Sequence, residues 1–308
     1  MNHYDIIIIG SGAAGLSAGL YAGRYGLKAL IIGAELGGET ARAGVIENWP
    51  GDIEVEGFKL IMRMRDHAEK NGAEIVAGEV KSAEKSRDNF VITLTNGDTH
   101  TGTALILAQG SNRRRLGLPN EEELTGKGVH YCVTCDGPVY TDKTIAVVGG
   151  GDASVKGINL AAQYAKKIYL IVRGSEIKAE PINRERMEKL GEQMEVLFET
   201  EVKEIVGENI LDHVVLSKEY NGSTNLDIDG LFIEIGAVPD GEVANQLGVS
   251  LDEYGYTAAD TMMVTNVPGV FVAGDMVNIF GHFKQVVTAA ATGSVAATSA
   301  FEYVKKHK

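Results

Sequence analysis

The sequence predicts an α/β protein in which two units, each with a parallel sheet, share one chain. Three segments carry this prediction, because each is an apolar run that ends in a glycine-rich turn and precedes a stretch rich in small residues. These segments are Tyr4–Gly15, Lys143–Ser154 and Val267–Asp275. Alternating strands and helices are typical of parallel sheets joined by crossover helices. A chain of 308 residues, 44% of them hydrophobic, is long enough to form two separate cores.

The first turn, GSGAAG, has the GxGxxG spacing that binds the pyrophosphate of a dinucleotide. Gly10 permits a tight turn, Gly12 lets the backbone approach the phosphates, and Gly15 lets the following helix pack on the strand. That helix directs its N-terminal amides at the phosphates. The predicted phosphate-binding residues are Gly10, Ser11, Gly12, Ala13, Ala14 and Gly15. Glu35 ends the next strand, where a carboxylate can accept hydrogen bonds from ribose hydroxyls.

By itself, this turn does not distinguish FAD from NAD. The third segment contains GVFVAGD, which places Asp275 at the end of a strand and before a helix. An aspartate in that position can bind a ribityl hydroxyl, and the helix dipole can stabilise negative charge on a reduced flavin ring. FAD is therefore the preferred ligand of the first turn.

The second turn, VVGGGDAS, predicts a second dinucleotide site and hence two Rossmann-like nucleotide-binding domains. The strands ALILAQGSN and GLFIEIGAVPD are the expected crossings between them. We expect the second domain to be inserted into the first. Residues 1–113 and 238–308 then form an FAD-binding domain, and residues 114–237 an NAD(P)H-binding domain that carries the redox centre. The motif TNGDTH, around Asn96, predicts a β-hairpin.

The only two cysteines, Cys132 and Cys135, form a CxxC pair. No metal site is predicted, because zinc needs further ligands and the seven histidines are scattered without ligand spacing. A structural disulfide across so short a loop would stabilise the fold little. A redox-active dithiol is the favoured interpretation. Asp136 follows directly and can move the proton that thiol–disulfide exchange requires, although a role as a turn cap is the alternative.

The charge and hydropathy of the chain disfavour several classes of protein. A formal net charge of −13 argues against binding to nucleic acid or to an anionic membrane surface. No apolar run approaches the length of a membrane span, and the start of the chain lacks the pattern of a signal peptide. We therefore expect a cytoplasmic protein, in which two cysteines are more often chemical than structural.

Six motifs occur together in this chain, namely IIGSGAAGLSA, GGET, IENWPG, CVTCDG, VVGGGDAS and VPGVFVAGD. In their order and spacing the chain resembles the low-molecular-weight thioredoxin reductases over essentially its whole length. The resemblance implies a homodimer in which Cys135 faces the flavin, Cys132 attacks the disulfide of thioredoxin or a similar small redoxin, and Asp136 is the acid–base residue. It adds FAD contacts at Gly38, Glu39, Asn48, Val80, Lys284, Gln285 and Val286. It implies NADPH contacts at Gly149, Gly151, Asp152, Ala153, Ser154, Arg173 and Lys178.

The segment YLIVRGSEIKAEP departs from the pattern of that family. Val172-Arg173-Gly174 replaces a common His-Arg-Arg run, and Lys178 replaces an arginine. The loss matters for a 2′-phosphate, because arginine offers a bidentate fork and lysine a point charge. No acid ends this strand to accept ribose hydroxyls, which disfavours dedicated use of NADH. NADPH is the expected donor, with weakened discrimination against NADH, and reduced ferredoxin is the next alternative.

The predicted function is an FAD-dependent thioredoxin-disulfide reductase. A small-molecule dithiol oxidase and a flavin-binding redox sensor are the competing interpretations. The arginine run Arg113 to Arg115 suggests, in addition, a loop that docks an acidic partner.

Overall fold

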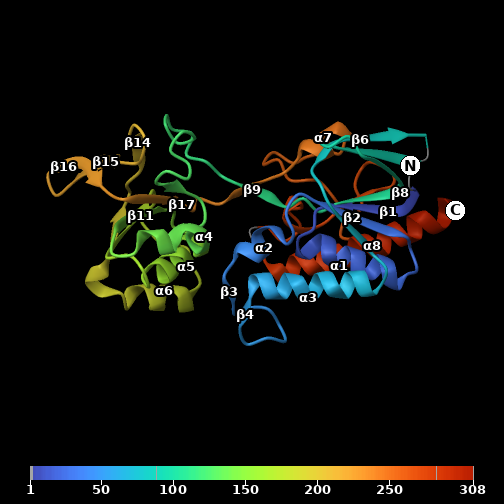
Figure 1. The fold of residues 1–308 in the computed structure, drawn as a ribbon, viewed down its shortest axis with the longest axis horizontal. Coiled ribbons are helices and arrows are strands. Elements are labelled where there is room, and N and C mark those ends of the chain that lie inside the picture. Colours follow the sequence, from blue (N-terminus) through green and yellow to red (C-terminus); the bar gives the residue numbers. More distant parts are fainter. Residues whose placement is uncertain (1–2, 88, 282, 308) are drawn as a thin grey trace. The chain divides into compact units, whose positions relative to one another are not determined.

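The computed structural model describes residues 3–87, 89–281 and 283–307. The chain divides into two compact units (Figure 1). Unit 1 comprises residues 1–112 and 238–308, and unit 2 comprises residues 113–237. Each unit contains its own sheet with parallel central strands and with helices packed against it, so the predicted fold class is confirmed.

The sheet of unit 1 has seven strands, of which six follow the order β5-β2-β1-β8-β7-β6 while β19 pairs with β8. Their bounds are β1 (His3–Ile9), β2 (Ala29–Gly33), β5 (Glu74–Ala77), β6 (Val80–Ser86), β7 (Asn89–Leu94), β8 (Thr99–Leu107) and β19 (Val270–Val272). Strands β5, β2, β1, β8 and β19 are parallel, as the strand–helix alternation predicts. The antiparallel pair β7–β8 turns at Asn96 and Gly97, which confirms the predicted hairpin.

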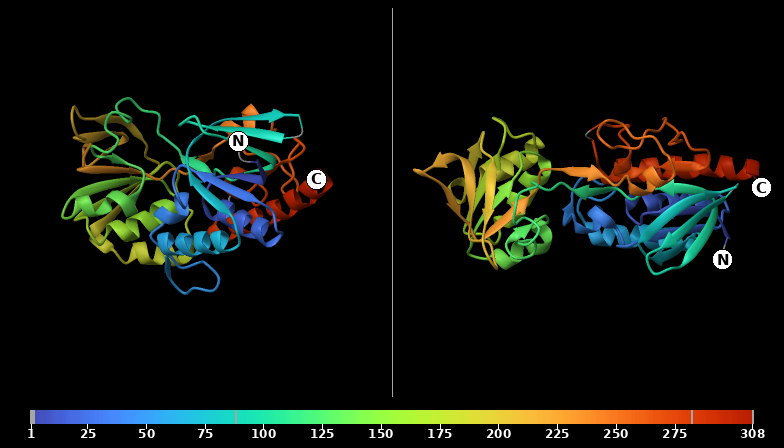
Figure 2. Two further views of the ribbon diagram at one scale, coloured as in Figure 1. Left: turned by 45° about the vertical axis from the view of Figure 1, so that its right-hand side comes forward. Right: turned by 90° about the horizontal axis from the view of Figure 1, so that it is seen from above.

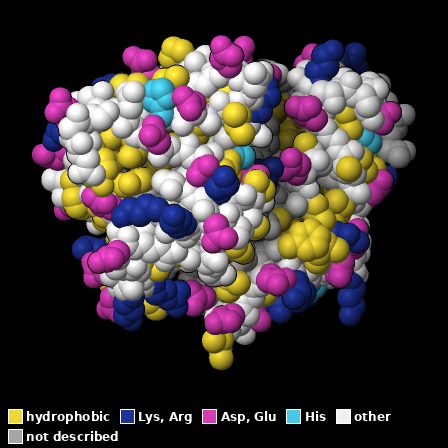
Figure 3. Space-filling model, turned by 60° about the vertical axis from the view of Figure 1, so that its left-hand side comes forward, with side chains coloured by type: hydrophobic (Ala, Val, Ile, Leu, Met, Phe, Trp, Pro, Cys, Tyr) yellow, Lys and Arg dark blue, Asp and Glu magenta, His cyan; other side chains and the backbone are white. Residues whose placement is uncertain are grey.

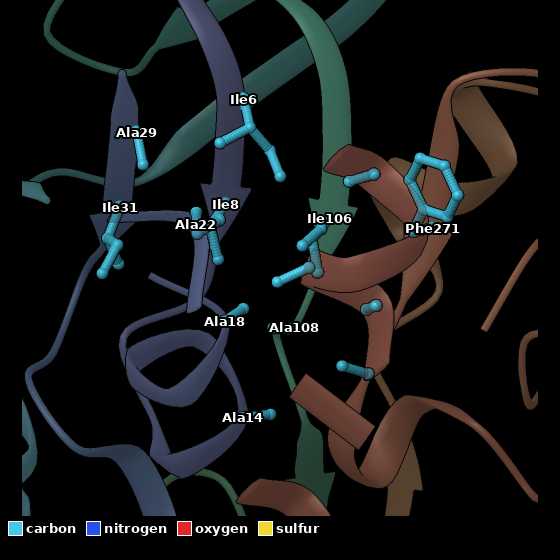
Figure 4. Packing of buried hydrophobic residues seen from close by; sticks show 14 of the residues in the cluster. Ile6, Ile8, Ala14, Ala18, Ala22, Ala29, Ile31, Ile106, Ala108 and Phe271 are labelled. Atoms are coloured by element: carbon cyan, nitrogen blue, oxygen red, sulfur yellow. The ribbon is translucent and has the colours of Figure 1, made fainter. Parts of the chain in front are cut away.

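Side chains of the central strands alternate between two cores on the two faces of the sheet. Ile6 and Ile8 of β1 face one core, while Ile7 and Ile9 face the other. Helices α1 (Ala13–Arg24) and α8 (Val286–His307) cover the first face. Ala14, Ala18 and Ala22 lie along α1 beside the isoleucines of β1, as Figure 4 shows. These small side chains allow the two helices and the sheet to approach closely.

Shorter elements complete unit 1. They are α2 (Gly38–Arg42), β3 (Val45–Ile46), β4 (Val55–Glu56), α3 (Gly57–Lys70), α7 (Glu242–Gln246) and the 3-10 helix η3 (Gly274–Met276). Helix α3 packs on α1, and α7 packs near β6. The carboxyl ends of β1, β2 and β8 therefore open toward α2, η3 and the start of α8, where the first turn lies.

Unit 2 contains a five-stranded parallel sheet in the order β10-β17-β11-β12-β13. These strands are β10 (Val129–His130), β17 (Gly230–Ile233), β11 (Thr144–Val148), β12 (Lys167–Val172) and β13 (Met194–Phe198). One face packs on α4 (Val133–Asp136), the 3-10 helix η1 (Gly137–Tyr140), α5 (Asp152–Ala161) and α6 (Pro181–Glu188), with η2 (Gly191–Gln193) leading into β13. The other face packs on the antiparallel strands β14 (Val202–Val206), β15 (His213–Tyr220) and β16 (Ser223–Asp227) (Figure 1).

The chain passes between the units through two short strands, β9 (Ser111–Arg113) and β18 (Ala237–Pro239), which pair with each other. Figure 2 shows the two crossings side by side. Within unit 2, Arg114 N–H donates to Gly236 C=O at 3.0 Å, and within unit 1, Asp240 N–H donates to Gly110 C=O at 3.1 Å. The two ends of the inserted unit are therefore held together by backbone hydrogen bonds.

The surface reflects the acidic composition of the chain, which has 42 acidic and 29 basic residues. Figure 3 shows acidic side chains dispersed over one face and interspersed with basic ones. None of the helices that the structure describes combines the length and the apolar character needed to cross a membrane.

Candidate functional site

The first glycine turn joins β1 to α1 with almost no spare volume. A Cβ on Gly10, whose φ is +116°, would overlap the carbonyl of Ala108, and a Cβ on Gly15 would overlap the carbonyl oxygen of Gly10. Gly12 differs, because the nearest atom to a Cβ there is the Gly37 carbonyl oxygen at 3.8 Å. The open space at Gly12 faces a cavity, and α1 begins at Gly12 without a side-chain cap. The amides at its start are thus directed at whatever occupies that cavity.

This cavity has a volume of about 550 Å³ and lies wholly within unit 1. That volume falls in the usual range for ligand sites. Its wall contains thirteen of the fifteen residues predicted to contact FAD, namely Gly10, Ser11, Gly12, Ala13, Ala14, Glu35, Gly38, Glu39, Val80, Asp275, Lys284, Gln285 and Val286. Gly15 lies behind the wall, in the packing of the turn. Asn48 donates from Nδ2 to Gln285 Oε1 at 3.0 Å and so orients a residue of the wall.

Arg42, at the end of α2, is a wall residue that the sequence did not predict. It is hydrogen-bonded to both Glu35 and Glu39 and bridges the two carboxylates. Gln109, which the resemblance places near the flavin, follows β8 and also lines the wall, and its buried Oε1 has no hydrogen-bond partner among the described residues. The volume of the cavity and the open glycine turn in its wall fit a flavin dinucleotide.

Asp275 and Lys284 form the charged part of the same wall. Burial raises the pKa of Asp275, an effect that Lys284 opposes and Glu39 reinforces. Burial likewise lowers the pKa of Lys284, against the attraction of Asp275 and Asp252. Lys284 donates to the carbonyl of Val277 and lies 4.4 Å from the centroid of the Tyr256 ring. The lysine is therefore fixed in place beside Asp275 by a hydrogen bond and a cation–π contact.

The second glycine turn, in unit 2, repeats the geometry of the first. Gly149 has a φ of +146° and leaves no room for a Cβ beside the carbonyl of Glu234, whereas a Cβ on Gly151 would meet nothing within 4 Å. Gly151 is the N-cap of α5, which begins at Asp152. Ser154 is fully buried and donates to Gly151 C=O at 2.8 Å, while Ala153 lies between them in the first turn of α5. The sequence therefore places a second open phosphate-type turn in unit 2.

The carboxylate of Asp152 is fully occupied by protein groups. It accepts hydrogen bonds from Asn183 Nδ2 at 2.9 Å and from the Glu180 backbone N–H at 3.1 Å, and it lies 2.8 Å from Lys156 Nζ. These hydrogen bonds hold the pKa of Asp152 below its usual value although burial acts in the opposite direction. Asp152 thereby ties the start of α5 to the segment that precedes α6.

The two cations predicted to hold a 2′-phosphate have acidic neighbours. Lys178 Nζ lies 3.3 Å from Glu176, and the Lys178 N–H donates to Gly150 C=O at 2.7 Å. Arg173 contributes to the lowered pKa of Glu201, which is set mainly by Lys203. A 2′-phosphate at this edge would therefore compete with carboxylates for both side chains.

The arginine run at the crossing is largely engaged within unit 2. Arg113 lies 2.7 Å from the buried carboxylate of Glu234, at the end of β17. Arg115 lies 3.6 Å from Glu122. Arg113 is therefore a structural cation beside the second glycine turn, a role that the sequence did not reveal.

Cys132 and Cys135 form a disulfide at the start of α4. Cys132 is the N-cap of this short helix, and its Sγ accepts a hydrogen bond from the Cys135 N–H at 3.2 Å. Hydrogen bonds to a thiolate favour its formation. Asp136 ends α4, and one of its carboxylate oxygens lies 3.1 Å from His130 Nδ1. No group of side chains in the described part of the chain could hold a metal ion.

Comparisons with known proteins agree with these sites. A profile of the family described as "Pyridine nucleotide-disulphide oxidoreductase" matches residues 4–293. Thioredoxin reductase of Peptoclostridium acidaminophilum is 36% identical over 313 residues, which cover 99% of this chain and 98% of that protein. Thioredoxin reductase of Listeria innocua is 35% identical over 308 residues, which cover 99% of this chain and 95% of that protein.

Among solved structures, the crystal structure of Lactococcus lactis thioredoxin reductase in its FR conformation superposes with a TM-score of 0.92 at 33% identity. The match covers 98% of this chain and 99% of that one. A match of this extent, in a chain with a dinucleotide cavity, a second glycine turn and a CxxC disulfide, leads to one conclusion. The chain belongs to the pyridine nucleotide-disulphide oxidoreductase family and, within it, to the low-molecular-weight thioredoxin reductases.

Proposed function

We propose that this chain is an FAD-dependent thioredoxin-disulfide reductase that passes electrons from NADPH through the Cys132–Cys135 pair to thioredoxin or a similar small redoxin. The observation that carries this proposal is the Cys132–Cys135 disulfide, in a unit that also contains an open dinucleotide turn. Unit 1, with its large cavity, is the FAD-binding domain in this proposal. Unit 2 is the NAD(P)H-binding domain. Family membership supports the use of a flavin and a nicotinamide nucleotide.

Different residues of the cavity bind different parts of FAD in this proposal. The amides at the start of α1 face the pyrophosphate, and Glu35, held by Arg42, accepts hydrogen bonds from ribose hydroxyls. Asp275 and Gln109 both line the cavity, and in this proposal Asp275 binds a ribityl hydroxyl. When bound, FAD supplies the transfer of an electron pair between the nicotinamide and the disulfide.

The chemistry of the cysteine pair is thiol–disulfide exchange. In the reduced enzyme, the Cys132 thiolate attacks one sulfur of the redoxin disulfide, that S–S bond breaks, and the leaving sulfur takes a proton from Asp136. The ionised Asp136 then takes the proton of the Cys135 thiol, and the Cys135 thiolate attacks the Cys132 sulfur and restores the Cys132–Cys135 disulfide. The second redoxin sulfur leaves and takes that proton from Asp136, so the redoxin is released as a dithiol. The enzyme loses two electrons and two protons, and the redoxin gains them. The hydrogen bond to Cys132 Sγ supports Cys132 as the attacking thiolate.

NADPH is the proposed donor, with Gly149, Gly151, Asp152, Ala153, Ser154, Arg173 and Lys178 as its site. The open space at Gly151 supports a dinucleotide there. The pairing of Lys178 with Glu176 supports a weak preference for NADPH over NADH, because the phosphate must displace a carboxylate. We expect the two nicotinamides to differ by roughly tenfold or less in kcat/KM, which corresponds to ~1.4 kcal/mol.

A homodimer is also proposed. Unit 1 exposes several apolar side chains around a shallow groove, among them Val45, Phe58 and Ile53, the last with 91% of its surface exposed. Such patches mark protein–protein contacts more often than isolated exposed residues do. Light scattering on the purified protein checks this proposal.

The function is tested by steady-state reduction of an oxidised bacterial thioredoxin by the FAD-loaded protein, with NADPH and NADH in parallel. We expect thiol release that depends on both cysteines, so that Cys132→Ser and Cys135→Ser each abolish it. Release of peroxide without thioredoxin turnover would instead identify a dithiol oxidase. Absence of turnover with either nicotinamide, combined with rapid turnover after chemical reduction, would leave the reductase assignment intact and remove NADPH and NADH as donors.

A further inference from the structure

We propose that His130 is a positioning residue for the dithiol chemistry, which holds the Asp136 carboxylate beside the cysteines. The inference rests on the proposed function, because it concerns the residue that handles the proton in thiol–disulfide exchange. It assigns a role to a histidine whose position two residues before Cys132 would otherwise be read as part of a surface loop.

The geometry around His130 is that of a buried three-residue network. His130, at the end of β10, is 8% exposed. Its Nδ1 lies 3.1 Å from Asp136 Oδ2, and its Nε2 lies 2.6 Å from the Tyr140 hydroxyl. The network thus joins the end of β10, the end of α4 and the end of η1, and it brackets both cysteines in sequence.

The protonation of the ring follows from its two partners. An ionised carboxylate can only accept, so Nδ1 must carry the hydrogen and donate to Asp136. In a neutral ring, Nε2 is then the acceptor, and the Tyr140 hydroxyl donates to it. Burial lowers the pKa of His130, so the ring is neutral near pH 7. Burial also raises the pKa of Tyr140 to about 12, so its hydroxyl keeps its hydrogen.

Packing fixes the ring as firmly as the hydrogen bonds do. Phe232 of β17 stacks on His130 with ring centroids 5.3 Å apart, and Tyr140 meets Phe232 edge-on at 5.5 Å. A ring held on one face and at both nitrogens cannot turn away when the carboxylate gains or loses a proton. His130 therefore presents the same N–H to Asp136 throughout the cycle and holds the carboxylate in one position.

Other ionisable groups lie on the surrounding elements. Asp229 lies 3.3 Å from Lys143 and helps to raise the pKa of Tyr140, and Lys156 of α5 lies 2.8 Å from Asp152. The ring of Tyr164 lies near Gly137. Among the described residues, His130 is the side chain that contacts the Asp136 carboxylate directly.

The test measures pH profiles of the dithiol in two ways. In the first, the FAD-loaded protein is reduced anaerobically with dithionite and mixed with an oxidised bacterial thioredoxin. In the second, the protein is reduced with a phosphine, and the cysteines are alkylated with iodoacetamide, which requires neither flavin turnover nor a redoxin. Each profile gives a rate as a function of pH. The pH-dependent part of the profile that is absent in Asp136→Asn is assigned to Asp136 and is called the Asp136 limb. We expect His130→Ala to move that limb upward, since it removes one hydrogen bond to the carboxylate.

Three further variants make the test specific. In His130→Asn the amide nitrogen can stand near the place of Nδ1 and donate, so most of the shift should be rescued. Tyr140→Phe keeps the ring packing but removes the hydroxyl that donates to His130 Nε2, so the ring hydrogen is no longer restricted to Nδ1. This variant should move the limb upward by less than His130→Ala does. His213→Ala removes another histidine of unit 2 that contacts an aspartate, Asp212 at 3.1 Å, and should leave the limb unmoved.

The outcomes separate the two proposals. A wild-type protein that transfers no electrons to thioredoxin contradicts the proposed function, while the alkylation profile still decides the role of His130. If the limb stays in place in both His130→Ala and Tyr140→Phe and only the melting temperature falls, the positioning role is wrong. His130 is then a residue that contributes only to packing. A profile in which Asp136→Asn removes no limb overturns it as well.

Discussion

Gly12 and Gly15 are three positions apart in one turn, yet their missing Cβ atoms leave different spaces. At Gly15, the space is filled by the carbonyl of Gly10, so the glycine permits the fold. At Gly12, the space opens into the cavity, which leaves room for the predicted approach of a ligand to the backbone. The spacing of the motif predicted the close packing at Gly15 from the sequence, because that packing depends only on local chain geometry.

This difference predicts opposite results for one substitution. Gly15→Ala should destabilise unit 1 by several kcal/mol, since a backbone clash cannot relax. Gly12→Ala should leave the melting temperature of the flavin-free protein nearly unchanged but weaken FAD binding by about tenfold or more, that is by at least ~1.4 kcal/mol. Thermal melts and flavin titrations of the two variants check this, and equal effects on folding would contradict it.

His130 gives a second prediction at the level of one side chain. Because burial lowers its pKa, the folded state prefers the neutral ring, whereas the unfolded ring titrates near 6.5. The stability that the neutral ring provides is present above about pH 6.5 and is lost as the pH falls through the lower folded pKa. Denaturant unfolding of wild type and His130→Asn between pH 5 and 8 should therefore show a wild-type advantage that shrinks toward acid. An advantage that grows toward acid would contradict the burial argument.

The turn-and-helix elements were predictable, but the contacts that complete them were not. Hydrophobic periodicity and glycine spacing predicted β1–α1, β11–α5 and α8, because the local sequence determines strands, helices and turns of this kind. Arg42 was not predicted as a wall residue, because the cavity wall combines segments that are far apart in sequence. The role of Glu176 was not predicted for the same reason. Glu176 pairs with Lys178, and this pairing matters because the chain brings Lys178 back to the second glycine turn.

The segment between β12 and α6 yields a prediction about the donor. Glu176→Gln removes the carboxylate that pairs with Lys178, so the kcat/KM ratio of NADPH to NADH should rise several-fold. Glu188→Gln is the matched control, because Glu188 pairs with Arg184 at 3.6 Å within α6 itself. The ratio should stay at its wild-type value in the control. An unchanged ratio in Glu176→Gln would show that Lys178 does not meet the phosphate.

The whole chain consists of two units with separate cores, and this organisation follows from the repeated glycine turn. The sequence indicated both the duplication and the crossings near Arg113 and Ala237. It did not reveal that the crossings pair as β9 and β18, because an isolated pair of three-residue strands has no pattern of its own.

Separate cores predict that the units respond separately to flavin. The single tryptophan, Trp49, lies in unit 1 and reports that unit by fluorescence, whereas circular dichroism reports both units. FAD binds only the folded state of unit 1, so added FAD should raise the melting temperature measured by Trp49 fluorescence by several degrees. In the unfolding curve measured by circular dichroism, only the part that belongs to unit 1 should shift to higher temperature. Complete coincidence of the two signals, with and without FAD, would show that the units unfold as one.

The central claim is that electrons leave this protein through Cys132 and Cys135. The most direct measurement is an anaerobic single turnover, in which the FAD-loaded protein is reduced with dithionite, mixed with oxidised bacterial thioredoxin, and assayed for thioredoxin thiols. We expect two thioredoxin thiols per electron pair delivered from wild type. Cys135→Ser should instead stop at a mixed disulfide between Cys132 and thioredoxin and release no reduced thioredoxin. Thioredoxin that stays oxidised in the presence of the reduced wild-type protein, or that is reduced equally well by Cys135→Ser, would contradict it.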